Sequence, residues 1–293
     1  MSASADAVAF TVASDGFHAK LGESPAWSAR EGCVWWVDID GGLLCRTDIA
    51  SGATSNWSTP ERPGFVVLTE PDGLAVGMES GIFTFDPARS AFARIVAVDQ
   101  PGHRFNDATV DWTGRLWAGS MALDATQPTG VLYAIGADRK PRPMIRGLRT
   151  ANGLAADAKR SRLYLSDTNP AVQQIWTLAL DGDQGLLGER SPFIDFTRLE
   201  GRPDGAALDE EGNYWIAGVG GAMVYRFTPD GRLLDIHPTP CQFPTKPAFI
   251  GPRLDRIALT SKGGDTAADG AMAFSSPISP PGQAVPAWRI GGI

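Results

Sequence analysis

Four short motifs place an acidic or amide side chain beside glycine, proline or another small residue. They are Leu21-Gly22-Glu23-Ser24-Pro25, Arg104-Phe105-Asn106-Asp107, Thr150-Ala151-Asn152-Gly153 and Arg202-Pro203-Asp204-Gly205. Glu23, Asn152 and Asp204 offer only oxygen donors, which suit a hard or borderline divalent cation with water completing its coordination shell. Each motif taken alone is more typical of a solvated turn, because Asn-Gly and Asp-Gly are common hairpin dipeptides. We therefore expect these side chains to be presented by turns.

Other common catalytic patterns are absent from the sequence. There is no Gly-Lys dipeptide for a phosphate-binding loop, no Gly-x-Gly-x-x-Gly and no Gly-x-Ser-x-Gly. The isolated histidines His18, His103 and His237 argue against a histidine-rich zinc site. An oxygen-bound metal remains as the chemistry that the polar motifs favour.

The cysteines and the N-terminus favour a cytoplasmic location. Cys33, Cys45 and Cys241 are odd in number and widely spaced, which favours buried reduced thiols over disulfides. Met1-Ser2-Ala3-Ser4-Ala5-Asp6 has neither a basic nor an apolar signal region, and no apolar stretch approaches the length of a membrane span. We expect a cytoplasmic protein that does not bind a membrane.

The composition favours a β-rich enzyme or binding protein over a nucleic-acid-binding one. The chain has 293 residues, 43% of them hydrophobic, and a formal net charge of −7, so it offers no basic face to a nucleic acid. Its 34 glycines and 22 prolines are typical of many short strands joined by turns.

One pattern recurs along the chain: a turn containing Gly or Asp leads into a short apolar and aromatic strand. Its equivalent positions are Trp35, Ala75, Trp117, Tyr164, Trp215 and Ala258, which are separated by 40, 42, 47, 51 and 43 residues. This period is typical of a four-stranded propeller blade. The sequence predicts an all-β, six-bladed β-propeller that forms a single domain over residues 1–293. Within the N-terminal segment 1–20, Ala9-Phe10-Thr11-Val12 is expected to pair with the last blade and close the ring.

The polar motifs recur at one phase of this repeat, just before the aromatic strand of four blades. Side chains at that phase converge on the central channel, although they are distant in sequence. The spacing therefore predicts that these side chains line one polar funnel that could hold a metal ion. The spacing alone does not predict which reaction takes place there.

The four motifs, in this order, resemble the signature of the senescence-marker-protein/gluconolactonase/regucalcin family. Gly114-Arg115-Leu116-Trp117-Ala118-Gly119-Ser120-Met121 also matches, and Thr245-Lys246-Pro247 with a following Phe is similar to the bacterial pentonolactonases. The resemblance extends from Leu21 to the last blade. Two positions depart from it: Ala108 stands where Gly is usual, and Phe249-Ile250-Gly251 lacks the double Gly of many relatives. Because of the second departure, Lys246 is expected near the site but is assigned no role in it.

The resemblance implies a propeller that binds one divalent metal ion (calcium, zinc, manganese or iron(II)) and hydrolyses sugar-acid lactones. It assigns the metal to Glu23, Asn152 and Asp204, and contacts with the substrate to Arg104, Asn106 and Asp124. Asp204 would also act as general base, Arg104 and Asn106 would donate hydrogen bonds to substrate oxygens, and Asp124 would accept them from sugar hydroxyls. The expected partner is a small sugar lactone, and the expected assembly is a monomer or weak homo-oligomer.

Three alternatives remain open at this stage. The chain could be a calcium-binding regulatory propeller without lactonase activity, although Arg104 and Asn106 argue against a site that only holds an ion. It could be an interaction scaffold, since folds are reused for many functions. It could also be a propeller esterase or organophosphatase, because the same metal would polarise those bonds.

Overall fold

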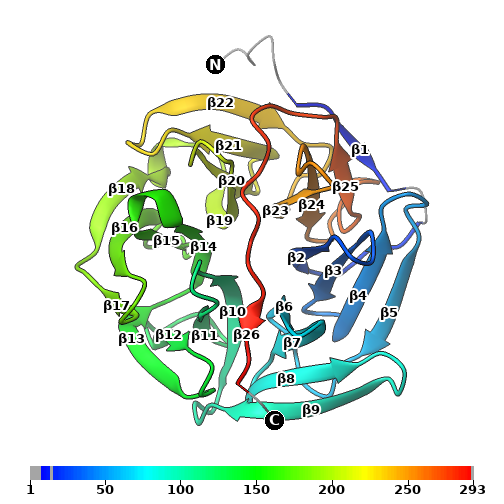
Figure 1. The fold of residues 1–293 in the computed structure, drawn as a ribbon. Helices are drawn as coiled ribbons and strands as arrows, with labels where there is room; N and C mark the ends of the chain where they lie inside the picture. The colour runs from blue at the N-terminus through cyan, green and yellow to red at the C-terminus, as the bar shows by residue number, and fades with distance from the viewer. Residues whose placement is uncertain (1–7, 14–15, 292–293) are drawn as a thin grey trace.

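The computed structural model describes residues 8–13 and 16–291, and it consists of a ring of six β-sheets around a central channel (Figure 1). The predicted all-β fold with six blades is confirmed. Its helical structure among the described residues is limited to the 3₁₀ turns η1 (Ala158–Arg160) and η2 (Phe196–Arg198). None of the helices found there is long and apolar enough to cross a membrane.

In the first five blades the first four strands are antiparallel and follow chain order from the channel outwards, and in the fourth blade β18 pairs with β16 as well. The first three blades comprise β2 (Gly22–Ser28), β3 (Cys33–Asp38), β4 (Leu43–Asp48) and β5 (Thr54–Ser58); β6 (Phe65–Glu70), β7 (Gly73–Gly77), β8 (Gly81–Asp86) and β9 (Ala91–Ala97); β10 (His103–Val110), β11 (Leu116–Ala122), β12 (Gly130–Ile135) and β13 (Pro141–Leu148). The fourth and fifth comprise β14 (Ala151–Asp157), β15 (Arg162–Asp167), β16 (Gln174–Asp181), β17 (Leu186–Leu187) and β18 (Ser191–Asp195); β19 (Arg202–Leu208), β20 (Tyr214–Val219), β21 (Met223–Phe227) and β22 (Leu233–Pro238).

The sixth blade joins the two ends of the chain. It contains β23 (Pro244–Ile250), β24 (Arg256–Ser261) and β25 (Ala273–Ser275), and β1 (Phe10–Val12) pairs antiparallel with β25 as its outermost strand. The inner strands β2, β6, β10, β14, β19 and β23 each contact their two neighbours around the channel. Residues 1–7 and 14–15 of the predicted N-terminal segment lie outside the described residues. They include the stretch 1–6, on which the prediction about a signal peptide rests.

The repeat found in the sequence corresponds to the second strand of every blade. Trp35, Ala75, Trp117, Tyr164, Trp215 and Ala258 lie in β3, β7, β11, β15, β20 and β24, respectively. Two of the turns that precede these strands are held by a buried acid. Asp111 accepts the Trp117 indole N–H at 2.8 Å, and Asp209 accepts that of Trp215 at 3.0 Å. The Asp-to-Trp spacing thus ties each turn to the aromatic side chain of the next strand.

The core lies between the blades. Among the described residues, the buried apolar side chains form six clusters, each shared by two adjacent blades. Adjacent strand residues point to opposite faces of a sheet, so Trp35 packs towards the second blade and Trp36 towards the sixth. All three cysteines are buried free thiols, as the sequence indicated.

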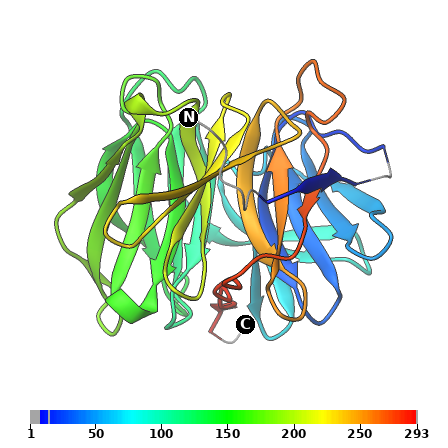
Figure 2. The same cartoon turned by 90° about the horizontal axis from the view of Figure 1, so that it is seen from above.

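The C-terminal segment crosses one face of the ring, in front of the channel in Figure 1 and beneath the blades in Figure 2. It ends in β26 (Trp288–Arg289), which pairs parallel with the inner strand β6. Trp288 is fully buried in the cluster between the second and third blades and anchors the segment there.

His237 links the chain end to the fifth blade. Its ring stacks on Trp215, with centroids 4.9 Å apart, and its Nδ1 accepts the Val8 N–H at 3.2 Å. Burial, with a smaller contribution from Arg226, lowers the pKa of His237 from 6.5 to about 4, and Asp235 acts in the opposite direction.

This depressed pKa predicts a loss of stability in mild acid. Between pH 6.5 and about 4 the unfolded chain binds a proton at His237 that the folded chain does not, so stability falls as the pH falls through this window. Between pH 7.5 and 5, His237 should contribute a loss of about 2 kcal/mol in the free energy of unfolding. Denaturant titrations of wild type and His237→Phe at both pH values measure this change in the free energy of unfolding. Phe is the matched replacement because it keeps an aromatic ring and does not titrate. An equal pH dependence in the two proteins would contradict the assignment.

Candidate functional site

Of the six predicted site residues, all except Asp124 lie within inner strands, not in turns. Glu23 is in β2, Arg104 and Asn106 are in β10, Asn152 is in β14 and Asp204 is in β19. The prediction of exposed turns is therefore wrong for these five residues.

A β-bulge explains why turn-like sequences occur in these strands. The pairing register shifts at Glu23/Ala26, Phe105/Ala108, Asn152/Ala155 and Pro203/Ala206. A bulge bends the strand and re-aims its side chains. At Gly153 the φ is +62°, and a Cβ there would lie 2.5 Å from Tyr214 Oη, so only glycine fits. The inner strand β6, by contrast, pairs without a shift from Phe65 to Thr69.

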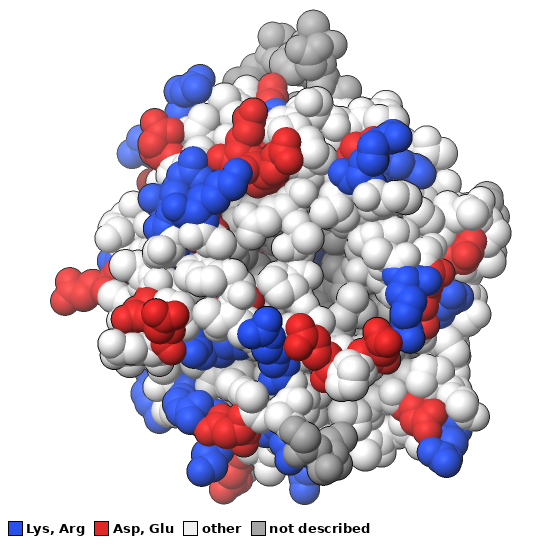
Figure 3. All heavy atoms as spheres, viewed as in Figure 1, with Lys and Arg blue, Asp and Glu red and all other residues white. Residues whose placement is uncertain are grey.

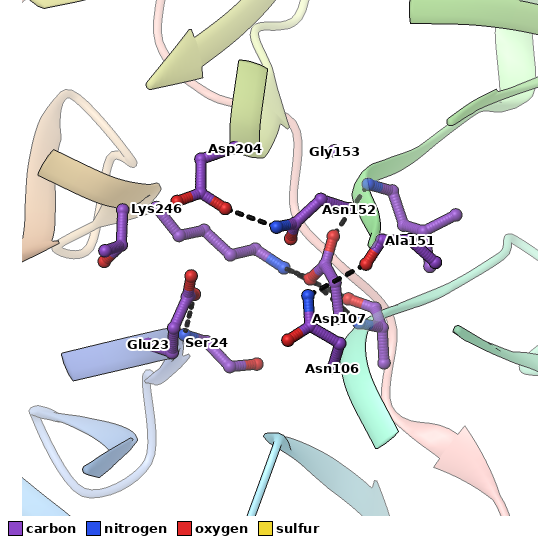
Figure 4. A network of polar contacts seen from close by, with 12 residues as sticks. Glu23, Ser24, Asn106, Asp107, Ala151, Asn152, Gly153, Asp204 and Lys246 are labelled. Atoms are coloured by element: carbon purple, nitrogen blue, oxygen red, sulfur yellow. Dashed lines mark hydrogen bonds and ion pairs between the residues drawn. The ribbon is translucent and has the colours of Figure 1, made fainter. Parts of the chain in front are cut away.

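The three predicted metal ligands meet at the channel axis (Figure 4). Glu23, Asn152 and Asp204 are at most 6% exposed. Asn152 Nδ2 donates to Thr168 Oγ1 at 2.9 Å and to Asp204 Oδ1. Asn152 Oδ1 is buried and has no hydrogen-bond partner among the described residues. The geometry thus brings two carboxylates together with an unsatisfied amide oxygen.

The two carboxylates are electrostatically crowded. Burial, followed by repulsion from Asp107, raises the pKa of Glu23 from 4.5 to about 7. Burial, followed by repulsion from Glu23 and Asp107, raises the pKa of Asp204 well above 3.8. Buried like charges of this kind are stabilised by a bound cation or by protonation.

Arg104 is a buried cation beside this cluster. Its Nη1 donates to Phe105 O at 2.9 Å and to Asn106 Oδ1 at 2.6 Å. Burial, with repulsion from Arg62, lowers the pKa of Arg104 to about 10, while Glu23 and Asp204 act in the opposite direction. Asn106 Nδ2 donates to Ala151 O in the next blade at 2.9 Å. Asn106 therefore holds Arg104 in place and connects β10 to β14.

Asp124 is not drawn into the cluster. It lies exposed in the turn after β11, and its carboxylate accepts hydrogen bonds from Thr126 N and Thr126 Oγ1, both at 3.0 Å. Its contact with sugar hydroxyls stays a prediction.

Two residues of the cluster had no role in the sequence analysis. Asp107 Oδ2 accepts the Leu154 N–H at 2.8 Å, and its Oδ1 forms a buried ion pair with Lys246 Nζ at 2.5 Å. Asp107 stands inside one of the four motifs, and Lys246 follows Thr245 in the corresponding inner strand of the sixth blade. A further register shift between Pro244 and Lys246 marks the same position. Asp107 and Lys246 stand at the register shift of an inner strand, as the predicted ligands do, and that shared place in the repeat could have identified both as candidate site residues.

A cavity of about 390 Å³ occupies the channel on the side where the inner strands end. Ser24 and Lys246 border it at the cluster, alanines of several inner strands form its wall, and residues 283–286 of the C-terminal segment line its far end. Figure 3 shows that face of the molecule, where charged side chains surround a central hollow bordered mostly by uncharged residues. The polar cluster is thus backed by an apolar space.

The cluster fits a divalent cation through its oxygen donors. No three Asp, Glu, His or Cys side chains of residues 8–13 and 16–291 are grouped so that they could hold an ion. The set therefore depends on the partnerless Asn152 Oδ1 in addition to Glu23 and Asp204. A ligand set of two carboxylates and one amide oxygen favours a hard or borderline cation that keeps water in its shell.

Comparisons with known proteins give the family. Residues 21–263 match the SMP-30/Gluconolactonase/LRE-like region. The chain is 36% identical over 277 residues to the 6-deoxy-6-sulfogluconolactonase of Pseudomonas putida. The matched region covers 91% of this chain and 94% of the relative. It is 32% identical over 248 residues to the pentonolactonase XacC of Haloferax volcanii, covering 84% and 83%.

A solved structure gives the same result. The crystal structure of regucalcin from Agrobacterium tumefaciens, described as a calcium-binding protein, matches with a TM-score of 0.89 and 27% identity over 97% of this chain and 98% of that one. The resemblance drawn from the four motifs is confirmed: this chain belongs to the SMP-30/gluconolactonase/LRE-like family.

Proposed function

We propose that this chain hydrolyses the lactone of a sugar acid to the free aldonic acid, using one divalent cation held by Glu23, Asn152 and Asp204. The observation that carries the proposal is the buried Asn152 Oδ1, which has no partner among the described residues and stands beside two crowded carboxylates. Relatives named sulfogluconolactonase, pentonolactonase and L-arabinolactonase support the reaction class. The predicted enzyme class, a lactonase, is confirmed at the level of the family.

The chemistry of ester hydrolysis explains why such a site needs these groups. A divalent cation supplies Lewis-acid polarisation of the lactone carbonyl and lowers the pKa of water. Arg104 would bind a substrate oxygen and stabilise the negative charge that develops on it. Its neighbours Asn106 and Phe105 fix two of its hydrogen bonds, so the guanidinium is oriented before the substrate arrives.

Asp204 would serve as the general base. Its carboxylate is buried, and burial followed by repulsion from Glu23 raises its pKa above the ordinary value, which makes it a better proton acceptor than an exposed carboxylate. Asn152 donates to Asp204 Oδ1 and holds the carboxylate in one orientation. Asp124 would accept hydrogen bonds from sugar hydroxyls at the rim.

A protein that only holds an ion is less well supported. Such a site has no need for Arg104, a buried guanidinium beside the cluster that could bind a substrate oxygen. We expect a cytoplasmic enzyme that acts as a monomer or weak homo-oligomer.

A panel of aldonolactones tests the reaction directly. Proton release is followed with a pH indicator for pentono- and hexonolactones, with phenyl acetate and an aryl phosphotriester as controls. We expect hydrolysis of at least one sugar lactone, loss of that activity after chelation, and recovery on adding Ca²⁺, Mn²⁺, Zn²⁺ or Fe²⁺. Activity that survives complete removal of metal would overturn the metal dependence, and activity on the control esters alone would overturn the substrate class.

Asp204→Asn separates the roles of Asp204 in binding and in folding. The change removes one carboxylate ligand and the base, so kcat/KM should fall by at least about a thousandfold and metal affinity should drop. The melting temperature of the metal-free protein should stay equal or rise, because repulsion with Glu23 is relieved. The exposed Asp183→Asn is the matched control. Wild-type turnover in Asp204→Asn would remove this residue from the site.

Arg104→Lys tests whether the guanidinium acts on the substrate. Lys keeps the charge but lacks the planar fork that can hold two oxygens at once. We expect kcat/KM to fall at least about tenfold, or roughly 1.4 kcal/mol, with metal affinity nearly unchanged. Arg198→Lys, at a side chain that is 84% exposed, is the control. A lower melting temperature with unchanged kinetics would make Arg104 a structural tie between blades.

A further inference from the structure

Lys246 enters the carboxylate cluster from the sixth blade. It belongs to the inner strand β23 and is 7% exposed. Its Nζ donates to Asp107 Oδ1 at 2.5 Å and to Ala108 O at 3.1 Å, both on β10. A lysine side chain thus reaches across the channel from β23 to β10.

The neighbouring backbone is shaped to admit this side chain. A Cβ on Gly205 would lie 2.4 to 2.7 Å from Cβ, Cγ and Cδ of Lys246, so any larger residue beside Asp204 would displace the lysine. In Figure 4 the Lys246 stem runs past Asp204 and Glu23 before its ammonium reaches Asp107. The glycine next to a predicted metal ligand therefore makes room for a fixed cation.

Asp107 has its acceptor capacity directed away from the predicted ligands. Its Oδ1 accepts from Ala108 N at 2.8 Å as well as from Lys246, and its Oδ2 accepts from Leu154 N. Lys246 also attracts the other two carboxylates, since it lowers the pKa of both Glu23 and Asp204. The Lys246 ammonium thus pairs directly with Asp107, and its charge also acts on Glu23 and Asp204.

We propose that Lys246 is a built-in counter-ion that neutralises Asp107, keeps it out of the coordination shell and so sets the affinity of the site for its divalent cation. This inference rests on the proposed function, because it concerns the cation held by Glu23, Asn152 and Asp204. The number of charged ligands tunes the affinity of oxygen sites for divalent cations over orders of magnitude. With Asp107 neutralised, the cation meets two uncompensated carboxylates instead of three, which leaves more of its Lewis acidity for a substrate.

A charge cycle on the metal-free protein tests the proposal, with Mn²⁺ binding followed by calorimetry rather than by activity. Lys246→Met releases the Asp107 charge, and we expect a Kd at least tenfold lower. Asp107→Asn leaves Lys246 without its partner, and we expect a Kd at least tenfold higher. The double variant should return to within about threefold of wild type. The exposed Lys140→Met is the control for loss of a positive charge elsewhere.

The signs of these changes decide the outcome. Weaker Mn²⁺ binding in both single variants would make the ion pair a structural clamp and overturn the inference, while the proposed function stands. A wild-type protein that binds no divalent cation and hydrolyses lactones after chelation would overturn the metal site itself. Circular dichroism checks folding of every variant. Should Lys246→Met not fold, Lys246→Gln replaces it with the same expectation, since Gln keeps an N–H donor for Asp107.

Discussion

The buried carboxylate of Asp107 holds the centre of the propeller together. It accepts hydrogen bonds from the backbone of its own blade at Ala108, from Leu154 in the next blade and from Lys246 in the sixth. A buried charge is tolerated only when such donors satisfy it. Since these donors lie on three different inner strands, the charge is satisfied only when the ring is closed. The site and the closed ring therefore depend on the same contacts.

The bulges of the inner strands convert this ring into a site. A regular strand alternates its side chains between the two neighbouring blades, as Trp35 and Trp36 show in the first blade. A register shift adds residues that face neither neighbour and can point along the channel. The second blade, whose inner strand β6 pairs without a shift, gives an apolar wall instead. Polar chemistry is thereby confined to one part of the channel.

The apolar space behind the cluster strengthens its electrostatics. Charges interact more strongly where water is excluded, and burial is the largest cause of the raised pKa of both Glu23 and Asp204. The C-terminal segment, anchored by Trp288, lines the far end of that space. Substrate would reach the cluster from the opposite mouth, where Arg104 and the exposed turn of Asp124 lie.

The sequence by itself determined the six blades, because each repeat contains its own turn, aromatic strand and hairpin. It also predicted a candidate site: Glu23, Asn152 and Asp204 stand at one phase of the repeat, and repeats of one ring converge on its axis. It misassigned their local structure, since a bulge and a hairpin turn use the same Asn-Gly and Asp-Gly pairs. Only the tertiary structure decided that Lys246 meets Asp107, 139 residues away. That contact joins blades that are not sequence neighbours, so its geometry is set by ring closure and by the space at Gly205, neither of which any local pattern encodes.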